Sequence, residues 1–241
     1  MKPINTLFFS KKRGSLFFLS RPMVMSFITL LGLVFFPPHG TTTAAPPEVK
    51  VGTFTQDEMA SWEERVFKGH TTYELVGEVP GLALRATCNG SASAFYRRIS
   101  VDLKRTPMLH WSWRVDGVHH GLDETTKAGD DYAARVYVVY TANSLLPWRV
   151  KAVDYVWSNS RPVGSHWPNA FTDRVMMVAL RSGPPAKPVQ WMSEVRNVRE
   201  DFKTFWGLDI TSIDGLAVMT DCDNGGGQAT GYYRDIRFTA E

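Results

Sequence analysis

The sequence has few cysteines and lacks the short motifs that mark several common catalytic folds. Cys88 and Cys222 are the only cysteines, and they stand far apart in the chain. A zinc ribbon or a redox CxxC motif needs closely spaced cysteines, so both are excluded. There is no G-x-G-x-x-G, P-loop, G-x-S-x-G or H-E-x-x-H pattern. Their absence disfavours nucleotide-binding folds, serine hydrolases of the elbow type and zinc peptidases.

The chain after residue 44 has no excess of basic charge. The 241 residues carry 27 Lys and Arg against 24 Asp and Glu, a net charge of +3. Residues 1–44 hold five of these bases and no acid, so residues 45–241 have 22 bases and 24 acids, a net charge of −2. A nucleic-acid-binding domain needs a clustered basic face. We therefore expect no nucleic-acid partner.

One short apolar run stands near the N-terminus. Met23–Phe36 has fourteen residues without a charge, fewer than the roughly 20 that a membrane-spanning helix needs. Bases before the run and two prolines after it are typical of a secretory signal. Thr42-Thr43-Ala44 fits the small-x-small cleavage rule, which predicts a signal peptide over 1–44 and a mature chain from Ala45. An uncleaved leader would instead be an N-terminal membrane anchor.

The leader predicts an exported protein, most simply a periplasmic one. No later apolar run is long enough to cross a membrane, so we expect no membrane span in the mature chain. Export allows disulfides. The sequence leaves open whether Cys88 and Cys222 pair or stay as buried thiols.

The mature chain shows mainly a two-residue hydrophobic period, which is typical of strands. We expect a flexible lead-in over 45–60 and one domain over 61–241, with a single short helix at Glu200–Trp206. Many strands with one helix predict an all-β fold, an antiparallel β-sandwich of jelly-roll type. The predicted strands are Thr71–Gly77, Leu82–Cys88, Ala94–Leu103, Met108–Val115, Tyr132–Thr141, Lys151–Ser158, Arg174–Arg181, Val189–Val198, Ile213–Thr220 and Tyr232–Thr239.

Acidic side chains gather in the loop Asp116–Asp131, which precedes the predicted central strand. Asp130 and Asp131 adjoin that strand, so a rigid sheet would hold them in place. Carboxylates of this kind bind hard cations or supply acid–base chemistry, and a solvated loop is the alternative. Arg135, inside the strand, needs a carboxylate partner if it is buried. Asp130, Asp131 and Glu194 are all candidates.

A second polar loop follows the strand that ends near Thr220. Asp221 and Asp223 match the first two ligand positions of an EF-hand, but Tyr232 stands where the EF-hand requires Glu. The loop is therefore not an EF-hand. Asp221, Asp223 and Asn224 form a candidate calcium or sugar-hydroxyl site, with a simple hairpin loop as the alternative.

Two further segments supply candidate ligand contacts. Trp157, Ser158 and Asn159 end a predicted strand, where an indole and hydrogen-bonding groups could hold a sugar ring; inward packing of the indole is the alternative. Glu194 and Arg196 share a strand face, for which a structural ion pair is the simplest interpretation.

Five blocks together resemble a known family. They are AGDDYAARVYVVY from Ala128, VDYVWSNSRPVGSHW from Val153, RSG from Arg181, EVRNVREDFKTFWG from Glu194 and MTDCDNGGGQATGYYRDIRF from Met219. They occur in the order of the bacterial exported family called domain of unknown function 3047. Cys222 departs from the family, which usually has Thr there.

The resemblance implies an exported single-domain protein without an established activity. It also implies similarity to jelly-roll carbohydrate-binding modules, a fold-level analogy that does not fix function. The family's polar signature falls here on Asp130, Asp131, Arg135, Trp157, Ser158, Asn159, Glu194, Arg196, Asn197, Asp221, Asp223, Asn224 and Asp235.

These observations predict a non-catalytic, exported β-sandwich that binds a glycan or another polar small ligand. Two alternatives remain: a carboxylate-dependent enzyme acting on glycans, and an envelope assembly protein without a small ligand. We expect no organic cofactor, and calcium is the one candidate ion. The predicted ligand-binding residues are Asp130, Asp131, Arg135, Trp157, Ser158, Asn159, Glu194 and Arg196, and the predicted metal residues are Asp221, Asp223 and Asn224.

Overall fold

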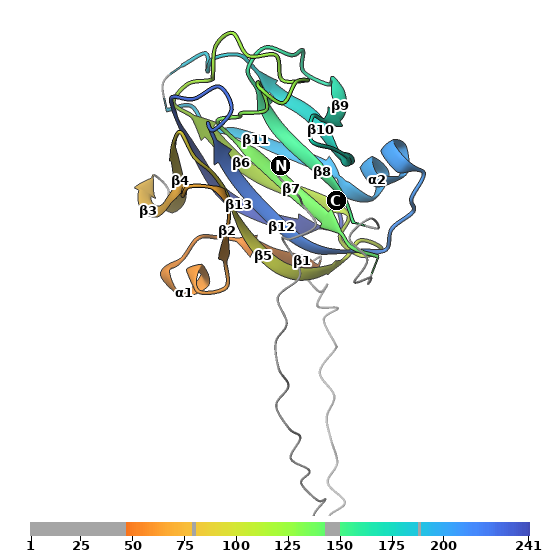
Figure 1. Cartoon of the computed structure of the whole chain (residues 1–241). Helices are drawn as coiled ribbons and strands as arrows, with labels where there is room; N and C mark the ends of the chain where they lie inside the picture. The colour runs from red at the N-terminus through yellow and green to blue at the C-terminus, as the bar shows by residue number, and fades with distance from the viewer. Residues whose placement is uncertain (1–46, 79–80, 143–149, 188) are drawn as a thin grey trace, which may run out of the picture. The chain divides into compact units, whose positions relative to one another are not determined.

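A computed structural model describes residues 47–78, 81–142, 150–187 and 189–241. These residues form two β-sheets and two short helices (Figure 1). The predicted all-β sandwich is confirmed. No helix among the described residues is both long enough and apolar enough to cross a membrane.

The first sheet, sheet A, has the strand order β11-β6-β13-β4-β3, and β1 also pairs with β13. All of its pairs are antiparallel. Its strands are β1 (Glu48–Gly52), β3 (Thr72–Glu78), β4 (Gly81–Asn89), β6 (Met108–Val115), β11 (Met192–Asn197) and β13 (Gln228–Thr239).

The second sheet, sheet B, has the order β2-β5-β12-β7-β8-β10-β9. It departs from the predicted antiparallel arrangement at one place, because β8 and β10 are parallel. Its strands are β2 (Glu63–Lys68), β5 (Ala92–Asp102), β7 (Arg135–Tyr140), β8 (Lys151–Ser158), β9 (His166–Asn169), β10 (Thr172–Ser182) and β12 (Ser212–Asp221).

The core between the sheets is built from alternate residues of facing strands. Trp111 and Trp113 of β6 cross at a ring-centroid distance of 5.4 Å, and Tyr155 of β8 packs against Trp111 at 5.3 Å. Val136 and Val138 of β7 belong to the same buried cluster. Two-residue alternation therefore places Tyr137, the residue between these valines, on the opposite face of sheet B.

A disulfide joins the two sheets. Cys88 lies in β4 of sheet A, Cys222 directly follows β12 of sheet B, and their Cα atoms are 6.1 Å apart. Both cysteines are fully buried. Of the two alternatives that the sequence left open, the structure thus shows the paired one.

Three edge strands and a helix were not expected from the sequence. β1 and α1 (Gln56–Met59) lie inside the predicted lead-in, so the sandwich begins earlier than predicted. β2 and β9 are short and largely solvent-facing, and such edge strands lack a clear apolar alternation. The structure also moves the start of the predicted Tyr132 strand to Arg135.

The predicted helix is α2 (Val198–Trp206), and the capping residues at its two ends explain where it begins and ends. Asn197 caps the N-terminus by accepting a hydrogen bond from the Glu200 amide. Gly207 ends the helix in a left-handed conformation with φ 66°. Asp235 also has a positive φ, 57°, in the bulge where the register of β13 against β6 shifts. Asn197 and Asp235 therefore serve the backbone.

Candidate functional site

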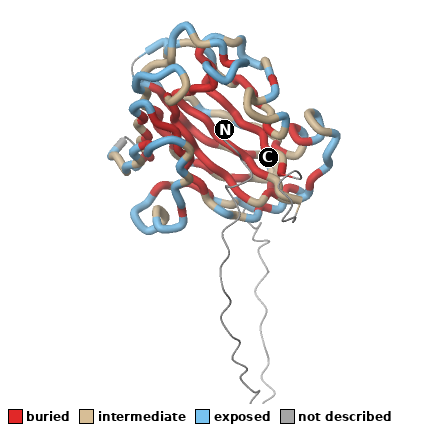
Figure 2. Tube along the Cα trace, in the orientation of Figure 1, coloured by how far each residue is buried: buried red, intermediate tan, exposed pale blue. Residues whose placement is uncertain are grey.

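Sheet B has a second buried layer on its outer face, the face turned away from sheet A. Tyr137 and Val139 of β7 belong to a buried cluster that contains no residue of the sheet A strands. Figure 2 shows the buried strands as a red band framed by exposed loops. Antiparallel sheets commonly have one apolar face and one solvated face. A sheet that is apolar on both faces needs something to cover it.

Small residues and tyrosines make up much of this outer face. Ala217 of β12 and Asp154 of β8 flank Tyr137 in register, and Ala217 also pairs with Tyr96 of β5. Alanines recur at neighbouring outer-face positions of four strands. Short side chains thus lie beside tyrosines on this face, and an aromatic ring offers a flat surface for packing. The outer-face alanines are Ala92, Ala94, Ala152, Ala179 and Ala217.

Arg135 lies at the centre of the charged part of this face, the Arg135 cluster (Asp130, Arg135, Asp154 and Asp221). Its guanidinium contacts Asp154 at 2.7 Å and Asp221 at 2.9 Å, with Asp130 at 3.7 Å. The rings of Tyr132 and Tyr137 lie 4.7 and 5.0 Å from its Cζ atom. All four members are buried. Three carboxyl groups thus surround one guanidinium.

Asp154 is the member with unused hydrogen-bonding capacity. Its Oδ2 accepts from Arg135, whereas its Oδ1 has no hydrogen-bond partner among the described residues. Burial raises the pKa of Asp154 to about 7, although Arg135 acts in the opposite direction. A buried carboxyl oxygen without a partner costs free energy unless a donor reaches it. The Tyr137 hydroxyl is nevertheless close enough to act on Asp154 as a hydrogen-bond donor, which lowers its pKa, so a ligand hydroxyl would add to donors that the protein already supplies.

The adjacent Asp131 bonds to the backbone of the loop that follows β12. Its carboxylate accepts hydrogen bonds from the backbone amides of Asp223, Asn224 and Gly225. The Asn224 side chain adds another donor. Asp131 is fully buried, so it fixes the loop that follows β12 rather than facing a ligand.

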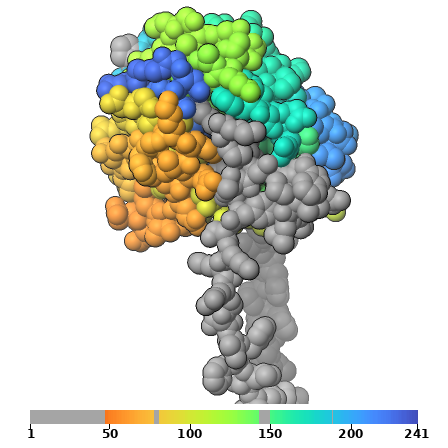
Figure 3. All heavy atoms as spheres, in the orientation of Figure 1, coloured from red at the N-terminus to blue at the C-terminus, as the bar shows by residue number. Residues whose placement is uncertain are grey.

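Glu124 bonds to the residues at the end of β8, close to Asp131. It accepts hydrogen bonds from the Ser158 hydroxyl and from the Asn159 backbone amide. The Asn159 side chain donates to the Asp131 carbonyl at 2.8 Å and accepts from the His119 amide at 3.0 Å. Ser158 and Asn159 thus join the end of β8 to the loop over 116–134. Figure 3 shows this loop in green, with the β2 region in orange.

The predicted calcium residues partly converge. One carboxylate oxygen from each of Asp131, Asp221 and Asp223 lies within 4.8 Å of the others. However, the oxygens of Asp221 already accept from the Tyr132 amide and from Arg135, and Asp131 accepts several N–H groups. Calcium takes six to eight oxygen ligands, and this set is bonded to N–H donors. The calcium site remains a prediction.

Glu194 and Arg196 do not pair with each other. Glu194 accepts hydrogen bonds from Trp113 Nε1 at 3.0 Å and Arg181 Nε at 2.5 Å. Arg196 bonds to Asp201, which also accepts from the Tyr155 hydroxyl at 2.6 Å. Both residues close the edge of the sandwich beside β11, away from the outer face of sheet B.

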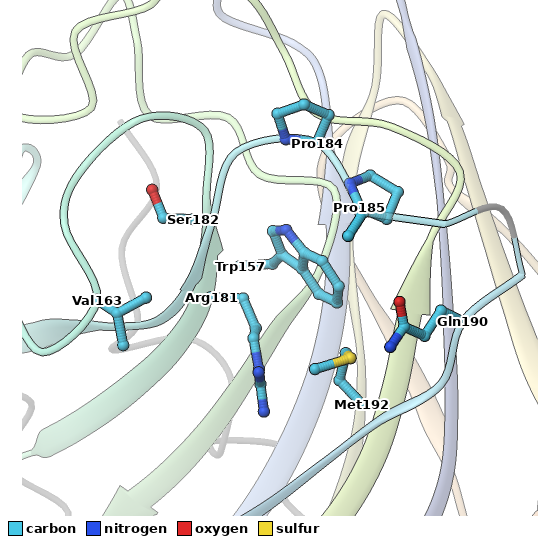
Figure 4. A pocket seen from close by; sticks show the side chains of 9 residues that line it. Trp157, Val163, Arg181, Ser182, Pro184, Pro185, Gln190 and Met192 are labelled. Carbon is cyan, nitrogen blue, oxygen red and sulfur yellow. The ribbon is translucent and has the colours of Figure 1, made fainter.

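A separate cavity of about 260 Å³ opens where the chain crosses from β10 to β11. Figure 4 shows the Trp157 indole between Pro185 and Arg181. Trp157 Nε1 donates to the Gly183 carbonyl at 2.9 Å. Trp157 itself is almost wholly buried and packs in the core between the sheets. We call this space the Trp157 cavity; its lining residues are Trp157, Val163, Arg181, Ser182, Pro184, Pro185, Ala186, Gln190 and Met192.

The structure thus assembles only part of the predicted site. Asp130 and Arg135 meet on the outer face of sheet B together with Asp221. Asp131, Ser158 and Asn159 bond to loops, Glu194 and Arg196 lie at the sheet edge, and Trp157 packs in the core beside the cavity. Sequence reasoning missed Asp154 and Tyr137. A signal for Asp154 existed, because one acid inside the apolar strand Lys151–Ser158 needs a partner when buried. Its partner Arg135 stands in the neighbouring strand.

Comparisons with known proteins add the family and similar folds. The model of a family described as "Protein of unknown function (DUF3047)" matches residues 60–237. No curated protein matches the chain.

Several solved structures are similar at low identity. The family 11 carbohydrate-binding module of a cellulosomal cellulase of Clostridium thermocellum is 10% identical; the match covers 82% of this chain and 97% of that one, with a TM-score of 0.46. A family 30 module from the same organism is 13% identical, with coverages of 75% and 92% and a TM-score of 0.45. The xyloglucanase domain of a Sinorhizobium fredii effector is 12% identical, with coverages of 83% and 100% and a TM-score of 0.41.

Proposed function

The chain belongs to the DUF3047 family, and we propose that this member binds a glycan or a similar hydroxyl-rich ligand on the outer face of sheet B. The proposal is made for the mature chain, which we expect to begin at Ala45. The ligand would lie over Tyr137 and the alanines and place hydroxyl groups against the Arg135 cluster.

One observation carries the proposal: three carboxyl groups surround the Arg135 guanidinium on a sheet face that is apolar and not part of the core between the sheets. A carboxyl oxygen accepts hydrogen bonds from sugar hydroxyls, and the tyrosine rings present flat surfaces to the C–H face of a sugar. The surplus of carboxyl groups over guanidinium makes the cluster poorly suited to an anionic ligand.

Isothermal titration of the secreted protein with soluble cell-wall and plant glycans tests the proposal. We expect at least one glycan to bind, and Asp154→Asn to raise its Kd at least tenfold, a loss of about 1.4 kcal/mol. Asn keeps the shape of Asp but changes the hydrogen bonds at Oδ1 and removes the charge. Absence of heat with every glycan would contradict the proposal.

A matched control uses a charged residue on the outer face of sheet A. Glu74 of β3 forms an ion pair with Arg85 of β4 and is exposed. Glu74→Gln makes the same chemical change outside the proposed site, so the Kd should stay the same. Equal loss of affinity in the Glu74 and Asp154 variants would place the ligand elsewhere. Thermal unfolding of both variants checks that they fold.

We also propose that the protein is exported, most simply to the periplasm. The support is the leader over 1–44 together with the buried Cys88–Cys222 disulfide, a bond typical of oxidising compartments. Mass spectrometry of the protein from a periplasmic extract should give an N-terminus at Ala45. A chain found intact in the membrane fraction would support the anchored alternative instead.

A second candidate function is a carboxylate-dependent enzyme acting on glycans. It is favoured by Asp154, whose pKa near 7 leaves it partly protonated at neutral pH beside the carboxyl groups of Asp130 and Asp221. Glycoside hydrolysis uses one protonated and one ionised carboxyl group. Release of reducing ends by the wild type but not by Asp154→Asn would establish the enzyme. Glycan binding without release of reducing ends would favour the binding function.

A further inference from the structure

We propose that the Trp157 cavity is a second ligand site, which takes a small compound of one or two aromatic rings. The cavity lies between β10 of sheet B and β11 of sheet A, with Met192 of β11 on one wall and Arg181 of β10 on another. It shares no residue with the Arg135 cluster, so the inference stands independently of the proposed function.

The size of the cavity limits the ligand. An engineered apolar cavity of about 150 Å³ admits benzene. The Trp157 cavity, at about 260 Å³, has room for one larger ring or two fused rings. Pockets for drug-sized ligands are commonly about 300–1,000 Å³, so an extended polymer or a large cofactor does not fit inside.

The walls favour an aromatic ring over a sugar. Trp157, Met192, Val163 and the prolines give apolar contacts. Trp157 Nε1 donates to Gly183 within the protein, and Arg181 Nε donates to Glu194. A sugar enclosed here would lose water from several hydroxyls, whereas Ser182 and Gln190 could bond to only some of them, which costs free energy.

An aromatic ring has no such requirement. It can pack against the apolar wall that Val163, Pro184 and Pro185 form, and the sulfur of Met192 can make favourable contacts with ring edges. A planar guanidinium can also stack on an aromatic ring; Arg181 lines the cavity, and Figure 4 shows its guanidinium pointing away from the Trp157 indole. Ser182 and Gln190 lie on the same lining and can bond to a polar substituent of the ring.

Two prolines form part of the cavity wall. Pro184 and Pro185 fix their own φ angles, and both line the cavity. These two residues therefore lose little backbone entropy when a ligand binds.

Saturation-transfer NMR on the full protein tests this inference with indole and 2-naphthol as probes. Methyl glucoside serves as the sugar comparison. We expect saturation transfer to both aromatic probes and none to the glucoside. Ala186→Trp puts an indole at the cavity lining and should raise the Kd of indole at least tenfold. Met192→Ala should weaken binding by removing a wall.

Two controls locate the probe. Val195→Trp adds the same indole at an exposed position of β11 that does not line the cavity, and it should leave the indole Kd unchanged. Asp154→Asn should also leave it unchanged. No transfer to either aromatic probe, or equal Kd values in wild type and Ala186→Trp, would overturn the inference. Transfer to the glucoside that Ala186→Trp abolishes would overturn the choice of an aromatic ligand.

Discussion

Charged side chains are arranged differently on the outer faces of the two sheets. On sheet A, Arg85 pairs with Glu74 and Arg237 of β13 pairs with Glu48 of β1, one base to one acid and partly exposed. On sheet B, Arg135 faces three carboxyl groups in a buried layer. The first arrangement is the usual solvated face of an antiparallel sheet. The second carries more carboxyl groups than guanidinium groups, and a backbone amide and the Asn169 side chain supply further hydrogen bonds to Asp221 and Asp130.

The strongest expected contrast comes from removing the arginine on each face. Arg135→Met leaves Asp130, Asp154 and Asp221 buried without a cation, and breaking a buried pair in this way costs about 3–5 kcal/mol. Arg85→Met removes an exposed charge and should barely change the free energy of unfolding. Urea unfolding of both variants checks this; similar losses would mean that the two faces do not differ.

The disulfide should have the next largest effect, because it ties β4 of sheet A to the end of β12, which carries Asp221. Cys88→Ser with Cys222→Ser should lower the free energy of unfolding by about 2–5 kcal/mol. Urea unfolding of oxidised wild type and the double variant measures it. The wild type with reductant should match the double variant. No difference would show that packing alone holds the sheets together.

A smaller effect is the dependence of stability on pH. The pKa of Asp154 is about 7 in the folded chain and 3.8 for an ordinary Asp. The folded state thus holds a proton that the unfolded state has released, so stability from Asp154 falls as pH rises from about 4 through 7. Melting temperatures between pH 5 and 8 should decline, and Asp154→Asn should flatten the decline. An unchanged slope in the variant would assign the pH dependence to other groups.

The smallest effect concerns the ion pair between Arg85 and Glu74. Both side chains are partly exposed, and exposed pairs contribute little and are screened by salt. Glu74→Gln should therefore shift the melting temperature by less than any change above, and the shift should vanish in about 1 M salt. If Glu74→Gln lowered the melting temperature more than Asp154→Asn does, the proposed difference between the two outer faces would be wrong.

Much of the fold follows from local sequence patterns. β8 has the predicted bounds, and Trp111 and Trp113 alternate inward in β6 because that strand is apolar on one face only. β7 carries apolar residues at successive positions. This pattern predicts a strand, but it does not tell which face of the strand packs in the core between the sheets. The edge strands β2 and β9 were missed because exposed strands need no apolar alternation.

The site was less predictable for a physical reason. Arg135 was expected to need an acid, but its partners Asp154 and Asp221 come from neighbouring strands whose order no single sequence fixes. Asp131 and Asn159 were expected at a ligand, and they bond instead to backbone groups of adjoining loops. A polar side chain near a strand end can bind a ligand or bond to the backbone of a loop. Which of the two it does depends on the backbone groups that the fold places beside it.

The central claim is that sheet B carries the ligand on its outer face. Amide chemical shifts recorded while the secreted protein is titrated with a glycan that binds it test this most directly. We predict that the largest shifts fall on β7, β8 and β12, around Arg135, Tyr137 and Asp154, and that they vanish in Asp154→Asn. Shifts concentrated on β6 and β13 of sheet A, or scattered without a centre, would contradict the account.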